Sequence, residues 1–350
     1  MSFRRVSVFL VVLIVAVSVL VVDPISPSAE APTVRALAHH LTHGFRNLDE
    51  SYSYSMSGRA LRLLGRTFER WPARGTPPAV LPNDGAELRA NGYAPTLSWI
   101  GHATFLVQLD GVNVLTDPNW SDRASPLPFA GPRRLVPPGM RFEDLPPIHA
   151  VVISHDHYDH LDAPTITRLA REHAPTFFVP LGLKPWLAHH GVRDVVELDW
   201  WEAKDFRGLR FTCTPAQHSS GRGFTDQNLT LWASWVIASP TRRLFFAGDT
   251  GYWAGAKEIG ERLGPFDVAA IPIGGYSSYA RRHPNHVNPE EAVQLFEDVK
   301  GRLLVPMHWG TFELNREPFR EPPERLEREA LRRGLDKNVA LLSPGQTIHW

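Results

Sequence analysis

The stretch AVVISHDHYDHLD, residues 150–162, joins a short apolar run to a dense group of histidines and aspartates. The apolar start is typical of a buried strand, so the polar residues lie in the loop at its carboxyl end, where α/β proteins place ligand sites. His155 and His157 point to one side of an extended chain. One helical turn then presents Asp159 and His160 to a neighbouring point. The stretch therefore predicts ligands for two adjacent metal positions, whereas a lone histidine in such a loop would more often be a surface group.

Four residues are too few for two closed sites, so we expect further ligands at other strand ends. His218 follows the apolar run of RFTCTPAQH, Asp249 follows RLFFAGD, and His308 follows RLLVPMH. A single histidine after a strand is usually structural, and Gly-Asp-Thr is often only a turn. Three such strand ends in one chain favour metal ligands over those interpretations.

The composition limits the alternatives. The chain has 350 residues, of which 43% are hydrophobic, and this is typical of a globular protein. Lys+Arg and Asp+Glu both number 37, so no basic excess favours nucleic acid as a partner. The only cysteine, Cys213, excludes an intramolecular disulfide framework and is most simply a small buried residue. A metal site must use imidazole and carboxylate, which suit zinc, manganese or iron.

The N-terminal residues 1–23 predict a signal sequence or membrane anchor. Arg4 and Arg5 precede an uncharged apolar run over residues 6–22. That length favours an uncleaved anchor, since a signal peptide core has about 7–15 residues and a spanning helix about 17–25. The arginines should stay on the cytoplasmic side, which predicts a catalytic domain on the extracytoplasmic side. Cleavage would instead give a secreted or periplasmic protein.

Residues 24–90 are predicted to be a linker and an N-terminal helical extension, with a helix over residues 58–71. From residue 91 to 350, short apolar runs come first alone and then alternate with helical segments, which predicts sheets covered by helices. The expected strands cover residues 96–101, 105–109, 112–117, 150–154, 176–180, 210–214, 231–238, 243–249, 268–273 and 302–309. The expected helices cover residues 164–173, 181–190, 254–263, 289–299 and 323–333.

The order H-x-H-x-D-H, His, G-D-T, His resembles the metallo-β-lactamase fold superfamily of binuclear zinc hydrolases. Longer stretches narrow the resemblance: WIGHATFLVQLDGVNVLTDPNWSDRASPLPFAGPRR, LPPIHAVVISHDHYDHLD, LDWW, LWASW, FFAGDTGYWAGAKEIGERLGPFDVAAIPIGGY, HVNPEEAVQLFEDV and HWGTFELNREPFREPPERL. Together they are similar to the N-acylphosphatidylethanolamine-hydrolysing phospholipase D family, from about Thr96 to the C-terminus. The first ninety or so residues carry no comparable motif.

The resemblance implies an α/β fold over residues 91–350, a four-layer αββα sandwich with the metals at one edge between the sheets. It implies two Zn²⁺ ions, with Mn or Fe as other candidates. The implied ligands are His155, His157 and His218 for one ion and Asp159, His160 and His308 for the other, with Asp249 bridging. The implied reaction is attack of a metal-activated hydroxide, oriented by Asp159, on a phospholipid phosphodiester. Its products would be phosphatidate and an N-acylethanolamine.

Four further residues have weaker signals. Asp117 in VLTDP resembles the family carboxylate that orients a ligand histidine, although an Asp-Pro turn is the alternative. Tyr158 could face the substrate or pack on its neighbours. His286 matches a family position near the substrate pocket, although Asn288 begins a predicted helix directly after it. His102 in GHATF is shared with the family, and we interpret it as structural.

The segment SSYARRHPN, residues 277–285, departs from the more apolar stretch of better-known members, which leaves the lipid preference open. A metal-dependent lactonase or other acyl hydrolase of the same fold is the alternative enzyme. A non-catalytic binding protein is a third hypothesis, against which the seven filled metal positions argue. The expected partners are a phospholipid substrate and a membrane surface, with no nucleic acid. The sequence leaves the oligomeric state open, with a homodimer as one alternative.

Overall fold

A computed structural model describes residues 37–49, 75–223, 225–276, 283–314 and 317–350. The predicted anchor over residues 1–23 and the predicted helix over residues 58–71 lie outside these ranges. Within the described ranges, no helix is both long enough and apolar enough to cross a membrane.

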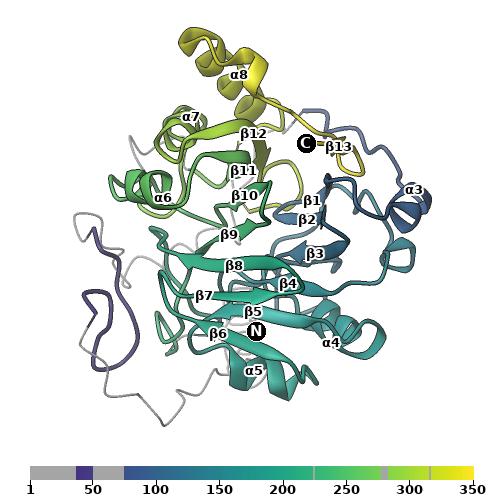
Figure 1. Ribbon diagram of the computed structural model, residues 1–350, viewed down its shortest axis with the longest axis vertical. Helices are drawn as coiled ribbons and strands as arrows, with labels where there is room; N and C mark the ends of the chain where they lie inside the picture. The colour runs from purple at the N-terminus through teal and green to yellow at the C-terminus, as the bar shows by residue number, and fades with distance from the viewer. Residues whose placement is uncertain (1–36, 50–74, 224, 277–282, 315–316) are drawn as a thin grey trace, which may run out of the picture.

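The first sheet has seven strands in the order β13-β1-β2-β3-β4-β5-β6 (Figure 1). Strands β1 to β3 pair antiparallel as hairpins, whereas β3 to β6 run parallel. The strands are β1 (Thr96–Gly101), β2 (Thr104–Leu109), β3 (Val112–Thr116), β4 (Ala150–Val152), β5 (Thr176–Pro180), β6 (Val195–Leu198) and β13 (Thr347–His349).

The second sheet has six strands in the order β12-β11-β10-β9-β8-β7, of which β10, β11 and β12 are parallel. They are β7 (Ala203–Phe206), β8 (Leu209–Thr214), β9 (Ser234–Ala238), β10 (Arg243–Phe246), β11 (Phe266–Pro272) and β12 (Gly301–Met307). In the parallel part, Leu244 pairs with Val268, which pairs with Leu303. All ten predicted strands are present, most with ends shifted by a few residues.

The two sheets face each other across a shared apolar core. Phe178 of β5 stacks on Phe211 of β8 with ring centroids 4.0 Å apart and an interplanar angle of 7°. At the edge that carries the polar loops, the Trp235 indole N–H donates to the Ile153 carbonyl at 2.8 Å. Both sheets are therefore apolar on the faces that meet, as a sheet-on-sheet core requires.

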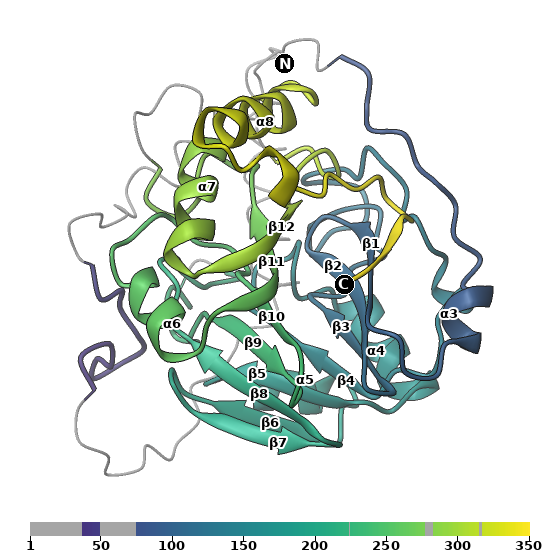
Figure 2. The same ribbon diagram turned by 45° about the horizontal axis from the view of Figure 1, so that its top comes forward.

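Helices cover the outer face of each sheet, which gives the predicted helix–sheet–sheet–helix order. On the first sheet, Leu169 and Trp186 pack with Val151 of β4 in one apolar cluster. Figure 2 shows α6 and α7 on the outer side of the second sheet, with α8 beside α7. The helices are α3 (Ala86–Ala90), α4 (Ala163–Glu172), α5 (Lys184–His189), α6 (Ala256–Arg262), α7 (Pro289–Asp298) and α8 (Glu321–Arg333), with 3₁₀ turns at Phe142–Asp144 and Asp336–Asn338.

Helix α7 begins where the sequence predicts. The Asn288 side chain accepts from the Glu291 backbone N–H at 2.8 Å, and Glu291 accepts from the Asn288 backbone N–H at 3.2 Å. Pro289 occupies the first turn, where its missing N–H costs nothing. This capping box fixes the direction in which the chain leaves His286.

Parts of the region expected as linker and extension contact the domain built from the two sheets. The Leu81 backbone N–H donates to the Pro344 carbonyl at 2.8 Å, and α3 precedes β1 directly. Residues 37–49 also contact the domain, through loops of the second sheet. The boundary at residue 91 stays a prediction.

Candidate metal centre

Both sheets send polar residues to one edge of the sandwich. The loop after β4 carries residues 155–160, while His218, Asp249 and His308 follow β8, β10 and β12. Strands β10 and β12 are parallel, and β8 runs in the same direction because β9 is antiparallel to both β8 and β10. Their carboxyl ends therefore lie at the same edge, where α/β folds form ligand sites.

Three histidines form the first cluster. His155 Nε2 lies 2.8 Å from His157 Nδ1, and His157 Nδ1 lies 3.3 Å from His218 Nε2. One nitrogen from each ring is within 4.8 Å of the others, which is the spacing of ligands around a single ion. The structure thus brings together the three residues predicted for the first metal.

The second cluster is formed by Asp159, His160 and His308. Asp159 Oδ2 lies 3.4 Å from His160 Nε2 and 3.3 Å from His308 Nε2. His102 joins them, since its Nε2 lies 2.9 Å from the same Asp159 oxygen. The predicted second ligand set is therefore assembled, with one additional imidazole.

Asp249 lies between the two clusters. Its Oδ2 is 3.2 Å from His160 Nε2 and 3.7 Å from His218 Nε2, and its Oδ1 is 3.1 Å from His308 Nε2. A carboxylate in this position can give one oxygen to each of two ions. This is the geometry expected of the predicted bridging residue.

The donor atoms fit divalent metal ions. His160 Nε2, His308 Nε2 and Asp249 Oδ1 are buried and have no hydrogen-bond partner within the described part of the chain. An unsatisfied buried polar atom costs about 1–3 kcal/mol, so several converging on one point need an explanation. Coordination to a metal supplies one. Imidazole and carboxylate donors without thiolate suit zinc, manganese or iron.

Asp117 supports this arrangement from behind the ligands. Its Oδ2 lies 2.7 Å from His160 Nδ1, and it accepts hydrogen bonds from the Ser154 backbone N–H at 2.7 Å and hydroxyl at 2.6 Å. With its N–H at Nδ1 donated to Asp117, His160 presents the lone pair of Nε2 to the metal. His218 has a similar support, because its Nδ1 lies 2.8 Å from the Asn285 carbonyl.

The electrostatics favour bound cations. Burial would lower the pKa of His308, but Asp249 and Asp159 together raise it to about 9. Burial would likewise lower the pKa of His160, which Asp249 and Asp159 raise well above its usual value. The pKa values of Asp159 and Asp249 shift the other way. Burial would raise the pKa of each carboxyl group, but the histidines around them hold both pKa values well below the usual range. The carboxylates therefore stay ionised.

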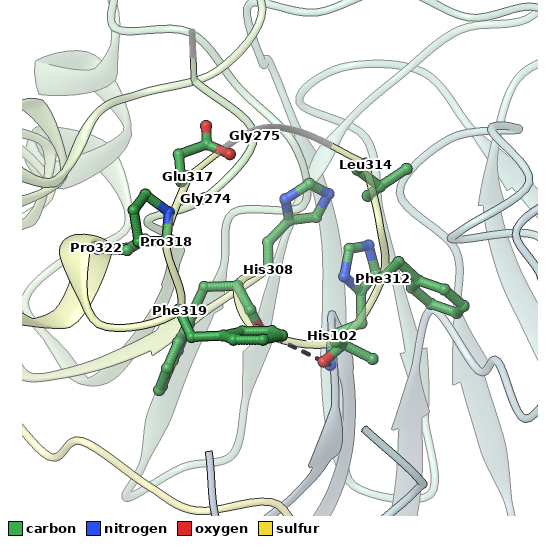
Figure 3. Close-up of a pocket in the computed structure, with 13 residues that line it drawn as sticks. His102, Gly274, Gly275, His308, Phe312, Leu314, Glu317, Pro318, Phe319 and Pro322 are labelled. Carbon is green, nitrogen blue, oxygen red and sulfur yellow. Dashed lines mark hydrogen bonds between the residues drawn. The ribbon is translucent and has the colours of Figure 1, made fainter. Parts of the chain in front are cut away.

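The importance of His102 is not evident from the sequence. It lies in the turn between β1 and β2 with φ 54° and is buried, and its ring centroid is 4.0 Å from that of His308. Figure 3 shows the two rings beside each other, with the His308 backbone N–H donating to the His102 carbonyl at 3.0 Å. Our interpretation of His102 as purely structural is incomplete, because its side chain contacts Asp159 directly. No local sequence pattern marks this role, because the left-handed backbone conformation of His102 is visible only in the structure.

A pocket opens beside these two rings (Figure 3). Aromatic and proline side chains form much of its wall, together with the carboxyl group of Glu317. The large apolar members are Trp309, Phe312, Leu314, Pro318, Phe319 and Pro322. The second ligand cluster therefore borders a pocket with both polar and apolar walls.

Tyr158 and His286, the two predicted substrate-binding residues, have different surroundings. Tyr158 lines a cavity of about 400 Å³ together with Trp186, and its ring stacks on the Arg222 guanidinium at 3.9 Å. The Tyr158 hydroxyl donates to the Arg222 carbonyl at 3.2 Å. His286 Nδ1 lies 3.7 Å from Asp249 Oδ2, so this residue lies at the centre itself.

The comparison with known proteins agrees with this architecture. Residues 112–309 match the family described as a beta-lactamase superfamily domain, which covers more than half of the chain. The chain belongs to the metallo-β-lactamase superfamily. An uncharacterized protein of Mycobacterium tuberculosis is 40% identical to this superfamily member over 336 residues, 93% of this chain and 89% of that protein.

Two further similarities concern proteins with a described activity. The N-acyl-phosphatidylethanolamine-hydrolyzing phospholipase D 1 of Caenorhabditis elegans is 45% identical over 242 residues, 66% of this chain and 68% of that protein. A solved structure of a novel metallo hydrolase from the archaeon Ignicoccus hospitalis has a TM-score of 0.57 and 26% identity, covering 73% of this chain and 98% of that one. The protein is a metal-dependent hydrolase of the metallo-β-lactamase superfamily.

Proposed function

We propose that this hydrolase cleaves a phosphodiester of a phospholipid, with N-acylphosphatidylethanolamine as the substrate and phosphatidate and an N-acylethanolamine as products. The observation that carries the proposal is the position of Asp249, whose two oxygens face the two ligand clusters. A pair of adjacent divalent ions suits in-line displacement at phosphorus. The similarity to the Caenorhabditis elegans phospholipase D supports the choice of lipid.

Different residues of the chain have different roles around such a pair of ions. When bound, two Zn²⁺ ions would lower the pKa of a water between them and neutralise charge on the phosphate. Asp159 would orient that water, and His102 Nε2 holds one Asp159 oxygen in place at 2.9 Å. Asp117 keeps His160 in the tautomer whose Nε2 faces the centre.

The cavity beside Tyr158 is suited to part of a phospholipid. Its wall combines apolar surface from Leu127 and Trp186 with the cationic side chains of Arg123 and Arg222 and the carboxyl groups of Asp122 and Asp162. Such a wall can take a glycerophosphate head and the first part of a chain. We therefore place the lipid between this cavity and His286, with the phosphodiester at Asp249.

A lipid substrate also agrees with the predicted anchor in residues 1–23. An anchor there would hold the catalytic domain beside a bilayer, on its extracytoplasmic side. This part of the proposal rests on the sequence alone.

The test is hydrolysis in ¹⁸O-labelled water. Zinc-loaded full-length protein is incubated with N-acylphosphatidylethanolamine in mixed micelles, and products are read by mass spectrometry. Attack on phosphorus puts the label in phosphatidate, whereas attack on carbon would put it in the N-acylethanolamine. Asp249→Asn should abolish turnover, whereas Asp267→Asn, which affects the β10–β12 surface around Arg302, should not.

A parallel panel of lactones and a bis-aryl phosphodiester separates the proposal from an acyl hydrolase. Turnover of lactones with no product from either phosphodiester would contradict it. Label in the N-acylethanolamine would contradict attack on phosphorus.

A further inference from the structure

Residues 37–49, here called the N-terminal strap, lie against loops of the second sheet although the family match begins only at residue 112 (purple in Figures 1 and 2). The Phe45 backbone N–H donates to the Asn228 carbonyl at 2.8 Å. The approach is tight at Gly44, which has φ 84° and where an added Cβ would lie 2.2 Å from the Asn228 oxygen. The strap is therefore fitted closely to the loop that follows His218.

Asn47 of the strap holds the backbone of the metal-cluster residue His218. Its Nδ2 donates to the His218 carbonyl at 2.8 Å, and its Oδ1 accepts from the His218 backbone N–H at 3.0 Å. The same Oδ1 accepts from the Trp232 indole N–H at 3.1 Å. His218 lies in a loop beyond the end of β8, so both its backbone polar groups depend on this one side chain.

The other end of the strap is held by a single carboxylate. His39 Nε2 and His40 Nε2 lie 2.7 Å from Asp199 Oδ1 and Oδ2, respectively. His39 is buried and stacks on Trp200 with ring centroids 4.2 Å apart. Both Asp199 oxygens are thus occupied by histidine N–H groups.

These three residues could in principle hold a metal ion, since their donor atoms lie within 4.8 Å of one another. The distances from their imidazole nitrogens to the carboxylate are shorter than those of His160 Nε2 and His308 Nε2 at the main centre. There, His160 Nε2 and His308 Nε2 stand 3.1–3.4 Å from carboxylate oxygens and have no hydrogen-bond partner among the described residues. At Asp199 the contacts are 2.7 Å hydrogen bonds, as expected of an anchor without metal.

We propose that the N-terminal strap is a positioning element of the metal centre. Asn47 fixes the His218 backbone, and the pair of histidines on Asp199 fixes Asn47. Partners that orient metal ligands typically affect metal affinity or activity by about 10- to 100-fold. The inference rests on the metal centre of the proposed function and is independent of the lipid.

The test compares Asn47→Ala with Asn91→Ala in the full-length protein. Asn91 is a matched control, because its amide holds the Ala94 backbone in the same two-bond pattern, at 2.8 and 3.0 Å, before β1 begins. Zinc affinity is measured by competition with a chromophoric chelator, and the absorption spectrum of the Co²⁺-substituted protein reports the ligand geometry. Melting temperatures report stability in both variants.

We expect Asn47→Ala to weaken zinc at one of the two sites by about 10- to 100-fold and to change the Co²⁺ spectrum. Asn91→Ala should lose stability without either effect. Asp199→Asn should weaken the same site, and its effect should not add to that of Asn47→Ala, because both act through one strap.

Three results would overturn the inference. If zinc affinity at both sites is unchanged in Asn47→Ala and in Asp199→Asn, the strap does not position the metal centre. A third zinc ion that is lost in a His39→Ala, His40→Ala double variant would make Asp199 a metal site instead of an anchor. Wild-type protein that binds no metal would overturn the proposed function as well, which distinguishes the two failures.

Discussion

His102 Nε2 lies 2.9 Å from Asp159 Oδ2, so the turn between β1 and β2 holds a carboxylate that belongs to the loop after β4. Burial and the neighbouring His308 lower the pKa of His102 to about 3, so its ring is neutral at physiological pH. A neutral ring with its proton at Nε2 donates to Asp159 and leaves the negative charge of that carboxylate for the metal.

We expect His102→Ala to lower kcat by about 10- to 100-fold, because Asp159 then loses the partner that orients it. His102→Gln can place an N–H near the same position and should recover part of the activity. Phe312→Leu is the control, since the Phe312 ring packs on His102 at 5.1 Å without contributing to the hydrogen bond. Steady-state kinetics on a phosphodiester measure kcat for each variant. Equal kcat values for His102→Ala and Phe312→Leu would count against a role of His102 in orienting Asp159.

Replacing Asp117 should affect the metal more than the fold. In Asp117→Asn the charge behind His160 is lost, and we expect about 10- to 100-fold weaker zinc binding at that ligand cluster. Ser154→Ala removes one donor to Asp117 but leaves the 2.7 Å contact with His160, so its effect should be smaller. Chelator competition measures both variants. The reverse order of the two effects would mean that Asp117 acts mainly on the loop backbone.

Metal removal should lower both activity and thermal stability. A ligand that binds only the folded state at 100 times its Kd stabilises it by about 2.7 kcal/mol. We therefore expect chelation to lower the melting temperature of the wild-type protein and added zinc to restore it, as read by calorimetry. In Asp249→Asn the fall of the melting temperature on chelation should be clearly smaller. A wild-type melting temperature that does not change on chelation would be incompatible with metal binding at the two clusters.

Zinc binding should release protons below pH 9. The pKa of His308 in the metal-free protein is raised from 6.5 to about 9, so between these values the folded chain keeps a proton that the metal must displace. Apparent zinc affinity should thus rise with pH through this range, and His160, whose pKa is also raised, contributes to the same rise. A pH-indicator dye in unbuffered solution at pH 7.5 measures the proton release. If no protons are released, His308 is already neutral in the metal-free protein.

The single thiol should be inert in the folded protein. Cys213 lies fully buried in β8, and burial raises the pKa of its thiol well above the usual value. A disulfide reagent should find no reactive thiol under native conditions and one per chain in denaturant. Fast labelling of the native protein would show that β8 opens locally, because β7 and β9 flank it in the sheet.

The strands that the sequence does not predict are all at sheet edges. β6 and β13 end the first sheet and β7 ends the second. Edge strands are short and partly solvated, so VVEL, AKDF and TIH lack the continuous apolar run that marks a central strand. The five-residue helix α3 is likewise too short to show a period.

The metal ligands are predictable because they follow apolar runs that end at one edge of the sandwich. Of the residues that hold them, Asp117 is suggested by the family resemblance, but His102 and Asn47 are not, since their contacts cross the chain. His102 contacts a residue 57 positions away, and Asn47 contacts one 171 positions away. Neither belongs to a local pattern that periodicity could detect, and only the folded chain brings them to the centre.

The division of the ligands between the two sheets has a consequence for biosynthesis. The first sheet contributes residues 155–160, but Asp249 and His308 follow strands of the second sheet. A nascent or truncated polypeptide that lacks β12 cannot complete the second cluster. Full metal occupancy therefore requires that both sheets have formed and packed together.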